Sequence, residues 1–234
     1  MSKSVCAVLG VGPGNGAAIA RRLARAGHPV ALLARSRDFT DSLAAELGNN
    51  SRAYSCDVAD PDSLKRVFTQ IRQDLGEIEV LAYNAGSGTW GNVEEVSAGD
   101  LETAWRVNVL GAFAAAREVI PHMKQHATGS IIFIGATASR RGAAGAAAFA
   151  QAKAAQRALA ESMARHLWPA GIHVGLVVID GVVDLPRTRE RMPNKPDSFF
   201  VKSEDVAETV YWLTQQPRSA WSFEVEARPF GEVW

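Results

Sequence analysis

Short apolar runs that alternate with longer amphipathic stretches are the feature that most limits how this chain can fold. The runs are Val5–Leu9, Val30–Ala34, Val80–Tyr83, Ile131–Ile134 and Val174–Ile179. Their continuous hydrophobicity is typical of strands buried on both faces. The stretches of helical length are Ala17–Ala26, Thr40–Gly48, Pro61–Leu75, Leu101–Lys124, Ala146–Trp168 and Glu204–Gln216. Strand alternating with helix predicts an α/β fold, in which a doubly wound parallel sheet carries helices on both faces.

Composition narrows the class of protein further. The 234 residues are 47% hydrophobic and 21% charged, which suits one core, and we find no linker that would divide residues 1–234. The net charge is zero, so we expect no nucleic-acid partner. We read neither a signal peptide nor an apolar stretch long enough to cross a membrane. Cys6 and Cys56 lie in apolar segments and are expected to be buried and reduced, which fits a cytoplasmic location.

A glycine-rich turn joins the first predicted strand to the first predicted helix. Its sequence is Gly10-Val-Gly12-Pro-Gly14-Asn15-Gly16. A pyrophosphate needs free backbone N–H groups at a helix N-terminus and close approach without Cβ atoms. The turn therefore predicts dinucleotide binding in a Rossmann-type, three-layer αβα fold. The alternative is a turn whose glycines serve only packing.

The end of the second predicted strand bears on the choice of nucleotide. A site that prefers NAD usually places an acidic residue there, but this chain has Ala34 followed by Arg35 and Ser36. A guanidinium matches a 2′-phosphate in charge and geometry. We therefore expect NADP(H) to be preferred over NAD(H). Alternatively, Arg35 is a solvated surface arginine.

The residues in order resemble the short-chain dehydrogenase/reductase family over most of the chain. Leu9-Gly10 with Gly14-Asn15-Gly16 is similar to its glycine motif, with leucine in place of threonine. Asp57-Val58 matches the Asp-Val that touches adenine in the family, and Asn84-Ala85-Gly86 matches its Asn-Ala-Gly. Asn108 matches the asparagine of its fourth major helix, and Phe149-Ala-Gln-Ala-Lys153 stands where its Tyr-x-x-x-Lys belongs. The resemblance implies a cofactor site in which the glycine motif, Asp57-Val58, Asn84-Ala85-Gly86 and Lys153 are joined by Gly181 and Val182.

The departures from the family pattern concern catalysis. Phe149 stands at the tyrosine position and Ala136 at the serine position, thirteen residues earlier. The family's Pro-Gly is matched by Asp180-Gly181, and Leu185 stands where a threonine is expected. In the family the tyrosine protonates the carbonyl oxygen that the serine orients. Phenylalanine has no ionisable proton and alanine donates no hydrogen bond, so the expected acid is missing.

Two polar residues of the family's catalytic set, Lys153 and Asn108, are present in this chain. The resemblance implies that Lys153 binds the nicotinamide ribose and that Asn108 takes part in catalysis. Lys153 and Phe149 face the same side of one helix, because they are four residues apart. We hypothesise that Lys153 donates a proton through water, or that the acceptor is an activated alkene protonated from solvent. The alternatives are a surface lysine and an asparagine that caps local backbone.

Substrate and partners are less well defined. Trp90, Ala136, Thr137 and Phe149 are expected to line an apolar pocket, although Trp90 could instead serve packing. The three-proline segment Asp184–Phe199 is expected to be a loop that forms a lid or is disordered. The small residues of Gly142–Ala160, together with Leu101–Met123, suggest a homodimer or homotetramer. His122 and His126 lack a third ligand, so no metal site is expected.

Two functions remain open at this point. The first is an NADP(H)-dependent oxidoreductase that acts on an apolar carbonyl, alcohol or enone with unusual proton delivery. The second is a catalytically silent protein that binds the cofactor as a sensor, regulatory subunit or structural partner. An intact phosphate cradle with a missing acid fits both functions. The sequence has no Gly-x-Ser-x-Gly elbow and no P-loop, which argues against a serine hydrolase and a P-loop enzyme.

Overall fold

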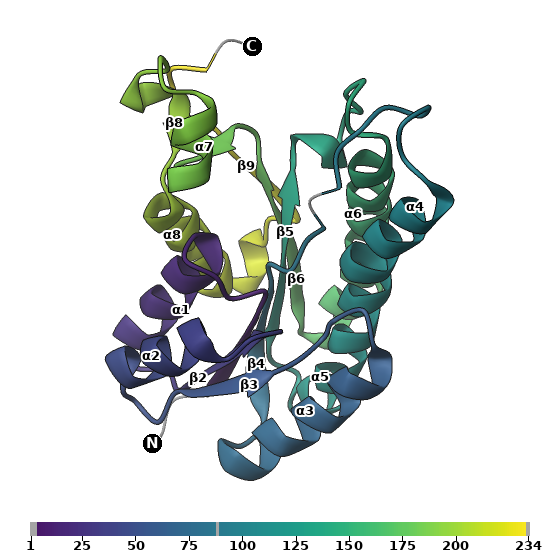
Figure 1. Ribbon diagram of the computed structural model, residues 1–234. Helices are drawn as coiled ribbons and strands as arrows, with labels where there is room; N and C mark the ends of the chain where they lie inside the picture. The colour runs from purple at the N-terminus through teal and green to yellow at the C-terminus, as the bar shows by residue number, and fades with distance from the viewer. Residues whose placement is uncertain (1–3, 88, 233–234) are drawn as a thin grey trace.

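The computed structural model describes residues 4–87 and 89–232 and contains one main seven-stranded sheet (Figure 1). All neighbouring strands in it are parallel, in the order β3-β2-β1-β4-β5-β6-β9. The strands are β1 Val5–Leu9, β2 Val30–Ala34, β3 Arg52–Ser55, β4 Ile78–Tyr83, β5 Ser130–Ala136, β6 His173–Ile179 and β9 Glu224–Ala227. This sheet confirms the predicted doubly wound α/β fold. None of the helices in these residues is long and apolar enough to cross a membrane.

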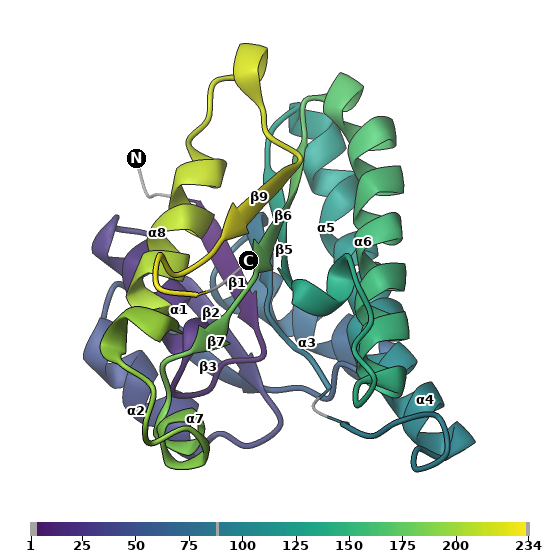
Figure 2. The same cartoon turned by 90° about the horizontal axis from the view of Figure 1, so that it is seen from above.

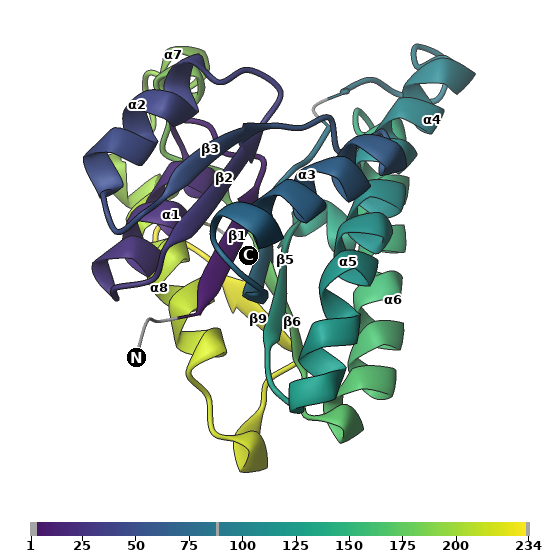
Figure 3. The same ribbon diagram turned by 90° about the horizontal axis from the view of Figure 1, so that it is seen from below.

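Helices cover both faces of the sheet (Figures 1 and 3). One layer holds α1 Asn15–Arg25, α2 Asp38–Leu47 and α8 Ser203–Thr214, and the other holds α3 Pro61–Asp74, α5 Gly111–His126 and α6 Ala147–Leu167. Along β1, Ala7 and Leu9 belong to the core beneath the second layer, whereas Cys6 and Val8 belong to the core beneath the first. The strands are hydrophobic throughout because both of their faces are buried.

Local chemistry fixes several helix ends. The Asp60 carboxylate accepts a hydrogen bond from the Asp62 N–H, and Pro61 occupies the first turn of α3, as the sequence predicts. Gly48 has a φ of +61°, a left-handed conformation that ends α2 at little cost for glycine. Both cysteines are buried and free, as predicted. Burial raises the pKa of the Cys56 thiol to about 11 and also raises that of Cys6.

The predicted helix Leu101–Lys124 is wrong as a single element. It begins earlier, as α4 Ala98–Trp105, because Ser97 and Asp100 form a capping box. A π-helical turn, Arg106–Leu110, then separates α4 from α5. Such a turn shifts the hydrogen-bond register and frequently occurs at functional sites. Asn108 lies within it.

The segment Asp184–Phe199 is more ordered than the predicted loop. It contains α7, Pro186–Arg191, and the short strands β7 Val182–Val183 and β8 Phe200–Val201 pair beside it. The Arg189 guanidinium binds the Asp184 carboxylate at 2.7 Å and that of Asp197 at 2.7 Å, and these pairs hold the segment together. Trp221 and Phe223 precede β9, and Trp234 lies outside the described residues.

The sheet reverses its winding between β1 and β4. The chain adds β2 and β3 on one side of β1, and then β4, β5 and β6 on the other. Leu9 pairs with both Leu33 and Tyr83, so the three strands end at the same level. Figure 2 shows α7 and α4 beyond the carboxyl ends of the strands, one on each side. Ligands of doubly wound sheets bind at such a reversal.

Candidate functional site

The glycine turn after β1 is closely packed at two positions. Gly10 has a φ of +81°, and a Cβ there would lie 2.5 Å from the Ala85 Cα. A Cβ on Gly16 would lie 2.5 Å from the Gly10 carbonyl oxygen. The Asn84 side-chain amide donates to that same carbonyl at 2.8 Å. The turn and the segment after β4 therefore form one unit that allows no side chain at Gly10 or Gly16.

The middle of the turn is open instead. A Cβ on Gly12 would meet no atom within 4 Å. Gly14, the N-cap of α1, provides no side chain for the free N–H groups, and the first turn carries no acidic residue. The Asn15 side-chain oxygen is buried without a hydrogen-bond partner in the described residues. Leu185 approaches from β7 and α7, with its Cδ2 2.8 Å from a Cβ placed on Gly14. Here the turn can accept an anion against backbone N–H groups.

Arg35, Ser36, Asp57 and Val58 lie where β2 and β3 end. The Arg35 side chain is exposed and makes no ion pair in the described part of the chain, whereas its carbonyl accepts from the Ser55 hydroxyl at 3.0 Å. The Ser36 hydroxyl donates to Asp38 at 2.9 Å. The Asp57 carboxylate accepts from the Ala59 N–H at 2.9 Å, and Val58 is half-buried. The four residues thus border the same carboxyl end as the glycine turn.

Lys153 is buried in α6, which excludes the surface lysine considered from the sequence. Its side chain is only 4% exposed, and its Nζ donates to the Ile134 carbonyl at 2.8 Å and to the Gln156 Oε1 at 3.0 Å. Burial lowers the pKa of Lys153 to about 7, because charge is disfavoured away from water. The amine can therefore exist in either protonation state near neutral pH.

Asn108 faces Lys153 from the π-helical turn and is completely buried. Its side-chain amide donates to the Ala104 carbonyl at 2.8 Å, so it does bind local backbone. The Oδ1 has no hydrogen-bond partner among residues 4–87 and 89–232. A Cβ on Gly86 would lie 3.4 Å from this Oδ1 and 3.7 Å from the Lys153 Nζ. The absence of a side chain at Gly86 therefore leaves space beside both polar groups.

Phe149 and Trp90 form an aromatic pair next to the lysine. Their ring centroids lie 5.1 Å apart, and the Lys153 Nζ lies 5.9 Å from the centre of the Phe149 ring. Trp90 is 62% exposed, so it is a surface residue and not a core one. Ala136 ends β5 and is half-buried. These three residues contribute apolar surface and no hydrogen-bonding side chain except the Trp90 indole N–H.

Thr137 is engaged in a polar cluster that the sequence analysis missed. Its hydroxyl donates to the Asp180 carboxylate at 2.6 Å, which Arg141 and Arg228 also bind, at 3.2 and 3.1 Å. Asp180 is only 4% exposed. The sequence did contain one signal from which this cluster could have been found, the carboxylate of Asp180 in place of the family's proline after β6. Thr137 consequently donates its proton within the protein.

Gly181 and Val182 lie at the start of the segment over the carboxyl end. A Cβ on Gly181 would be 2.7 Å from Pro229 and 2.8 Å from Glu232, so the C-terminal segment packs directly on it. Val182 pairs with Phe200 in the two-stranded sheet. The position of the C-terminal segment against Gly181 could not be predicted from the sequence, because the contact depends on the route of the chain after β9.

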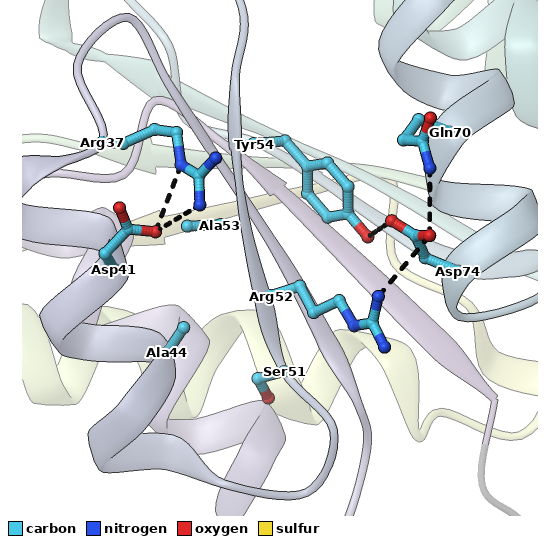
Figure 4. A pocket seen from close by; sticks show the side chains of 9 residues that line it. All are labelled: Arg37, Asp41, Ala44, Ser51, Arg52, Ala53, Tyr54, Gln70 and Asp74. Carbon is cyan, nitrogen blue, oxygen red and sulfur yellow. Dashed lines mark hydrogen bonds and ion pairs between the residues drawn. The ribbon is translucent and has the colours of Figure 1, made fainter.

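A surface hollow of about 460 Å³ lies away from these residues, at the outer edge of the sheet (Figure 4). Asp74 accepts from the Tyr54 hydroxyl and the Gln70 amide, each at 3.0 Å, and Arg37 binds Asp41 at 2.8 Å. Its polar side chains therefore satisfy one another. Residues that line it are Arg37, Asp41, Ala44, Ser51, Arg52, Ala53, Tyr54, Gln70 and Asp74. We assign the candidate site to the carboxyl end instead.

The chain is similar to known proteins over most of its length. Residues 4–195 match the model of the short chain dehydrogenase family. The 3-oxoacyl-acyl-carrier-protein reductase MabA of Mycobacterium bovis is 33% identical over 189 residues, 81% of this chain and 72% of that protein. The crystal structure of a short-chain dehydrogenase from Rhodopseudomonas palustris has a TM-score of 0.82 and 33% identity, and covers 97% of this chain and 99% of its own.

A metagenomic short-chain oxidoreductase in complex with NADP superposes with a TM-score of 0.84 and 27% identity, covering 98% of each chain. The match to the family model extends over the glycine turn, the lysine of α6 and most of the sheet. The protein therefore belongs to the short-chain dehydrogenase family of oxidoreductases.

Proposed function

We propose that this protein binds NADP(H) and transfers hydride to an apolar carbonyl or activated alkene, with Phe149 and Ala136 at the positions of the family's tyrosine and serine. The observation that carries the proposal is Lys153, a buried amine that lies beside Gly86 together with the Asn108 Oδ1, an acceptor with no hydrogen-bond partner in the described residues. A buried acceptor without a partner is costly, so it calls for a donor such as a ribose hydroxyl.

The residues present fit a dinucleotide. The open middle of the glycine turn would hold the pyrophosphate against the N–H groups of α1, and Gly86 leaves room beside Lys153 for the ribose. Asp57 and Val58 would adjoin the adenine at the end of β3. Leu185 lies over Gly14 and provides no hydroxyl to a ligand. The preference for NADP(H) over NAD(H) rests on Arg35, whose exposed guanidinium would bind a 2′-phosphate.

When bound, NADPH supplies the hydride. Phe149 excludes water from the reacting face and offers no proton, and the Thr137 proton goes to Asp180. Lys153 is then the amine that holds a proton beside the site, and its pKa of about 7 lets it release that proton near neutral pH. General acid catalysis is worth roughly 10²–10⁴-fold, so an acceptor that needs no strong acid is the better substrate.

The test is NADPH oxidation by stopped flow at 340 nm against matched saturated ketones and enones. We expect turnover of enones to exceed that of ketones. We also expect the double variant Phe149→Tyr with Ala136→Ser to increase ketone reduction by about 10²-fold or more. If every acceptor leaves the signal unchanged while NADPH binds to both proteins, the oxidoreductase proposal fails.

That negative outcome would support the second function, a cofactor-binding protein without catalysis. The observation that favours it is the engagement of the Thr137 hydroxyl with Asp180, so that this hydroxyl does not donate to an acceptor beside Phe149 and Ala136. Hydrogen exchange would then show that NADPH orders the segment from Gly181 to Phe199 although no acceptor reacts.

We also propose that the protein is a cytoplasmic homodimer or homotetramer. Leu101, Trp105 and Phe113 are each about 40% exposed, and their spacing of four and eight residues puts them on one side of α4 and α5. A second copy would cover this surface. Light scattering should show an oligomer, and Trp105→Glu should dissociate it. A wild-type monomer would contradict the proposal.

A further inference from the structure

Gln156 links the two polar residues of the site and was not singled out in the sequence. It follows Lys153 by three residues on α6 and is completely buried. Its Oε1 accepts from the Lys153 Nζ at 3.0 Å, and its Nε2 donates to the Asn108 carbonyl at 2.8 Å. The oxygen and the nitrogen of this one amide are therefore both hydrogen-bonded, the oxygen to Lys153 and the nitrogen to the backbone of Asn108.

The π-helical turn makes backbone carbonyls available for such contacts. The Gly111 N–H bonds to the Arg106 carbonyl, five residues back, and the Val107 carbonyl accepts from the Tyr83 hydroxyl at 2.5 Å. The next carbonyl, that of Asn108, accepts from Gln156. Side chains from β4 and α6 thus hold the turn in place, and Asn108 with it.

The role of the Gln156 amide follows from the number of N–H groups that Lys153 can donate. A neutral amine has two N–H groups, which the Ile134 carbonyl and the Gln156 Oε1 take up. Its lone pair, or the third N–H of the charged form, is left for the side where Gly86 leaves space. Burial alone lowers the pKa of Lys153, because no charged group of the described residues contributes to the shift.

We propose that Gln156 is a positioning residue that directs the third N–H of protonated Lys153, the one that binds neither Ile134 nor Gln156, toward the space between Gly86 and Asn108. The amide oxygen accepts a hydrogen bond but is too weakly basic to take up the proton, so Gln156 does not pass the Lys153 proton on toward the Asn108 carbonyl. The inference rests on the proposed function, in which that space receives the ribose and the reacting groups.

The experiment measures the titration of Lys153 directly, without cofactor. The chain has six lysines, and the NMR signal of the Lys153 side chain is the one missing from the spectrum of Lys153→Met. In Gln156→Glu a carboxylate replaces the amide oxygen, so we expect the pKa of Lys153 to rise by about 1 or more, at least tenfold in proton affinity. In Gln156→Leu the ammonium loses an acceptor, so we expect its pKa to fall by about 1.

Gln151→Leu is the matched control, because Gln151 lies on the same helix and bonds to the Ala148 and Leu101 carbonyls, away from Lys153. The proposal is overturned if both Gln156 variants leave the pKa within about 0.3 of wild type, or move it in the same direction. Gln156→Glu has nearly the shape of the native side chain, although it loses the N–H that donates to the Asn108 carbonyl, and it keeps the test valid if Gln156→Leu does not fold. A pKa that responds while NADPH does not bind would refute the proposed function and leave the role of Gln156 intact.

Discussion

The buried amine of Lys153 makes the stability of the protein depend on pH in a specific direction. Its pKa falls from 10.5 to about 7 on folding, because burial penalises the charged form. Between these values the unfolded chain binds a proton that the folded protein does not. The free energy of unfolding must therefore rise with pH across this window, and the destabilisation is fully present below about pH 7.

The variant Lys153→Met isolates this contribution. Every other group titrates in both proteins, and the loss of the donors to Ile134 and Gln156 changes stability by an amount that does not depend on pH. From about pH 7.5 to about pH 9.5, the stability of wild type relative to Lys153→Met should increase by about 2.5 kcal/mol. The six tryptophans make fluorescence a convenient probe of unfolding by urea.

Unfolding curves at several values of pH give this difference directly. A rise of more than about 1 kcal/mol in favour of wild type supports a neutral, buried lysine. A difference that stays flat, or that changes in favour of Lys153→Met as pH rises, would refute the reasoning. It would mean that the lysine is charged and solvated in the folded protein, with an ordinary pKa.

Three further predictions concern the glycine turn, the nucleotide and the polar cluster. Gly10→Ala should destabilise the protein by about 2 kcal/mol or more, from its positive φ and the clash with Ala85, whereas Gly12→Ala should keep the melting temperature yet weaken NADPH binding. A similar loss of stability for both would contradict the open turn. Arg35→Ala should raise the Kd for NADPH about tenfold and leave that for NADH unchanged in calorimetry, and equal losses would argue against a 2′-phosphate contact. Asp180→Ala should lose about 3–5 kcal/mol in urea unfolding, because it removes the buried carboxylate to which Thr137, Arg141 and Arg228 bind, and a loss under 1 kcal/mol would contradict a stabilising role for this cluster.

The sheet and most helices could be predicted because their signals are local. Continuous apolar runs mark β1 and β2, and Asp60 with Pro61 marks the start of α3. No continuous apolar run marks the edge strands β3 and β9, because β3 begins with Arg52 and ends with Ser55, and β9 contains Glu224 and Glu226. The break between α4 and α5 also escaped prediction, because a π-helical turn has no simple hydrophobic period.

For the site, the sequence indicated which residues gather but not how their polar groups are used. It placed Lys153, Asn108 and Phe149 together, and the structure brings them to one corner. It could not show that Thr137 is engaged by Asp180 or that Gln156 bridges Lys153 and Asn108. The contacts of Thr137 with Asp180 and of Gln156 with Asn108 join residues many positions apart, and their geometry depends on the packing of β5, β6 and α6.

We propose above that this fold binds NADP(H) with the nicotinamide ring beside Phe149, where other family members have the phenol of a tyrosine. Titration calorimetry of the wild-type protein with NADPH and with NADH tests it most directly. We predict saturable binding of NADPH, at least about tenfold tighter than that of NADH, as the Arg35 contact requires. Folded protein that gives no heat of binding with either nucleotide at millimolar concentration would contradict the account.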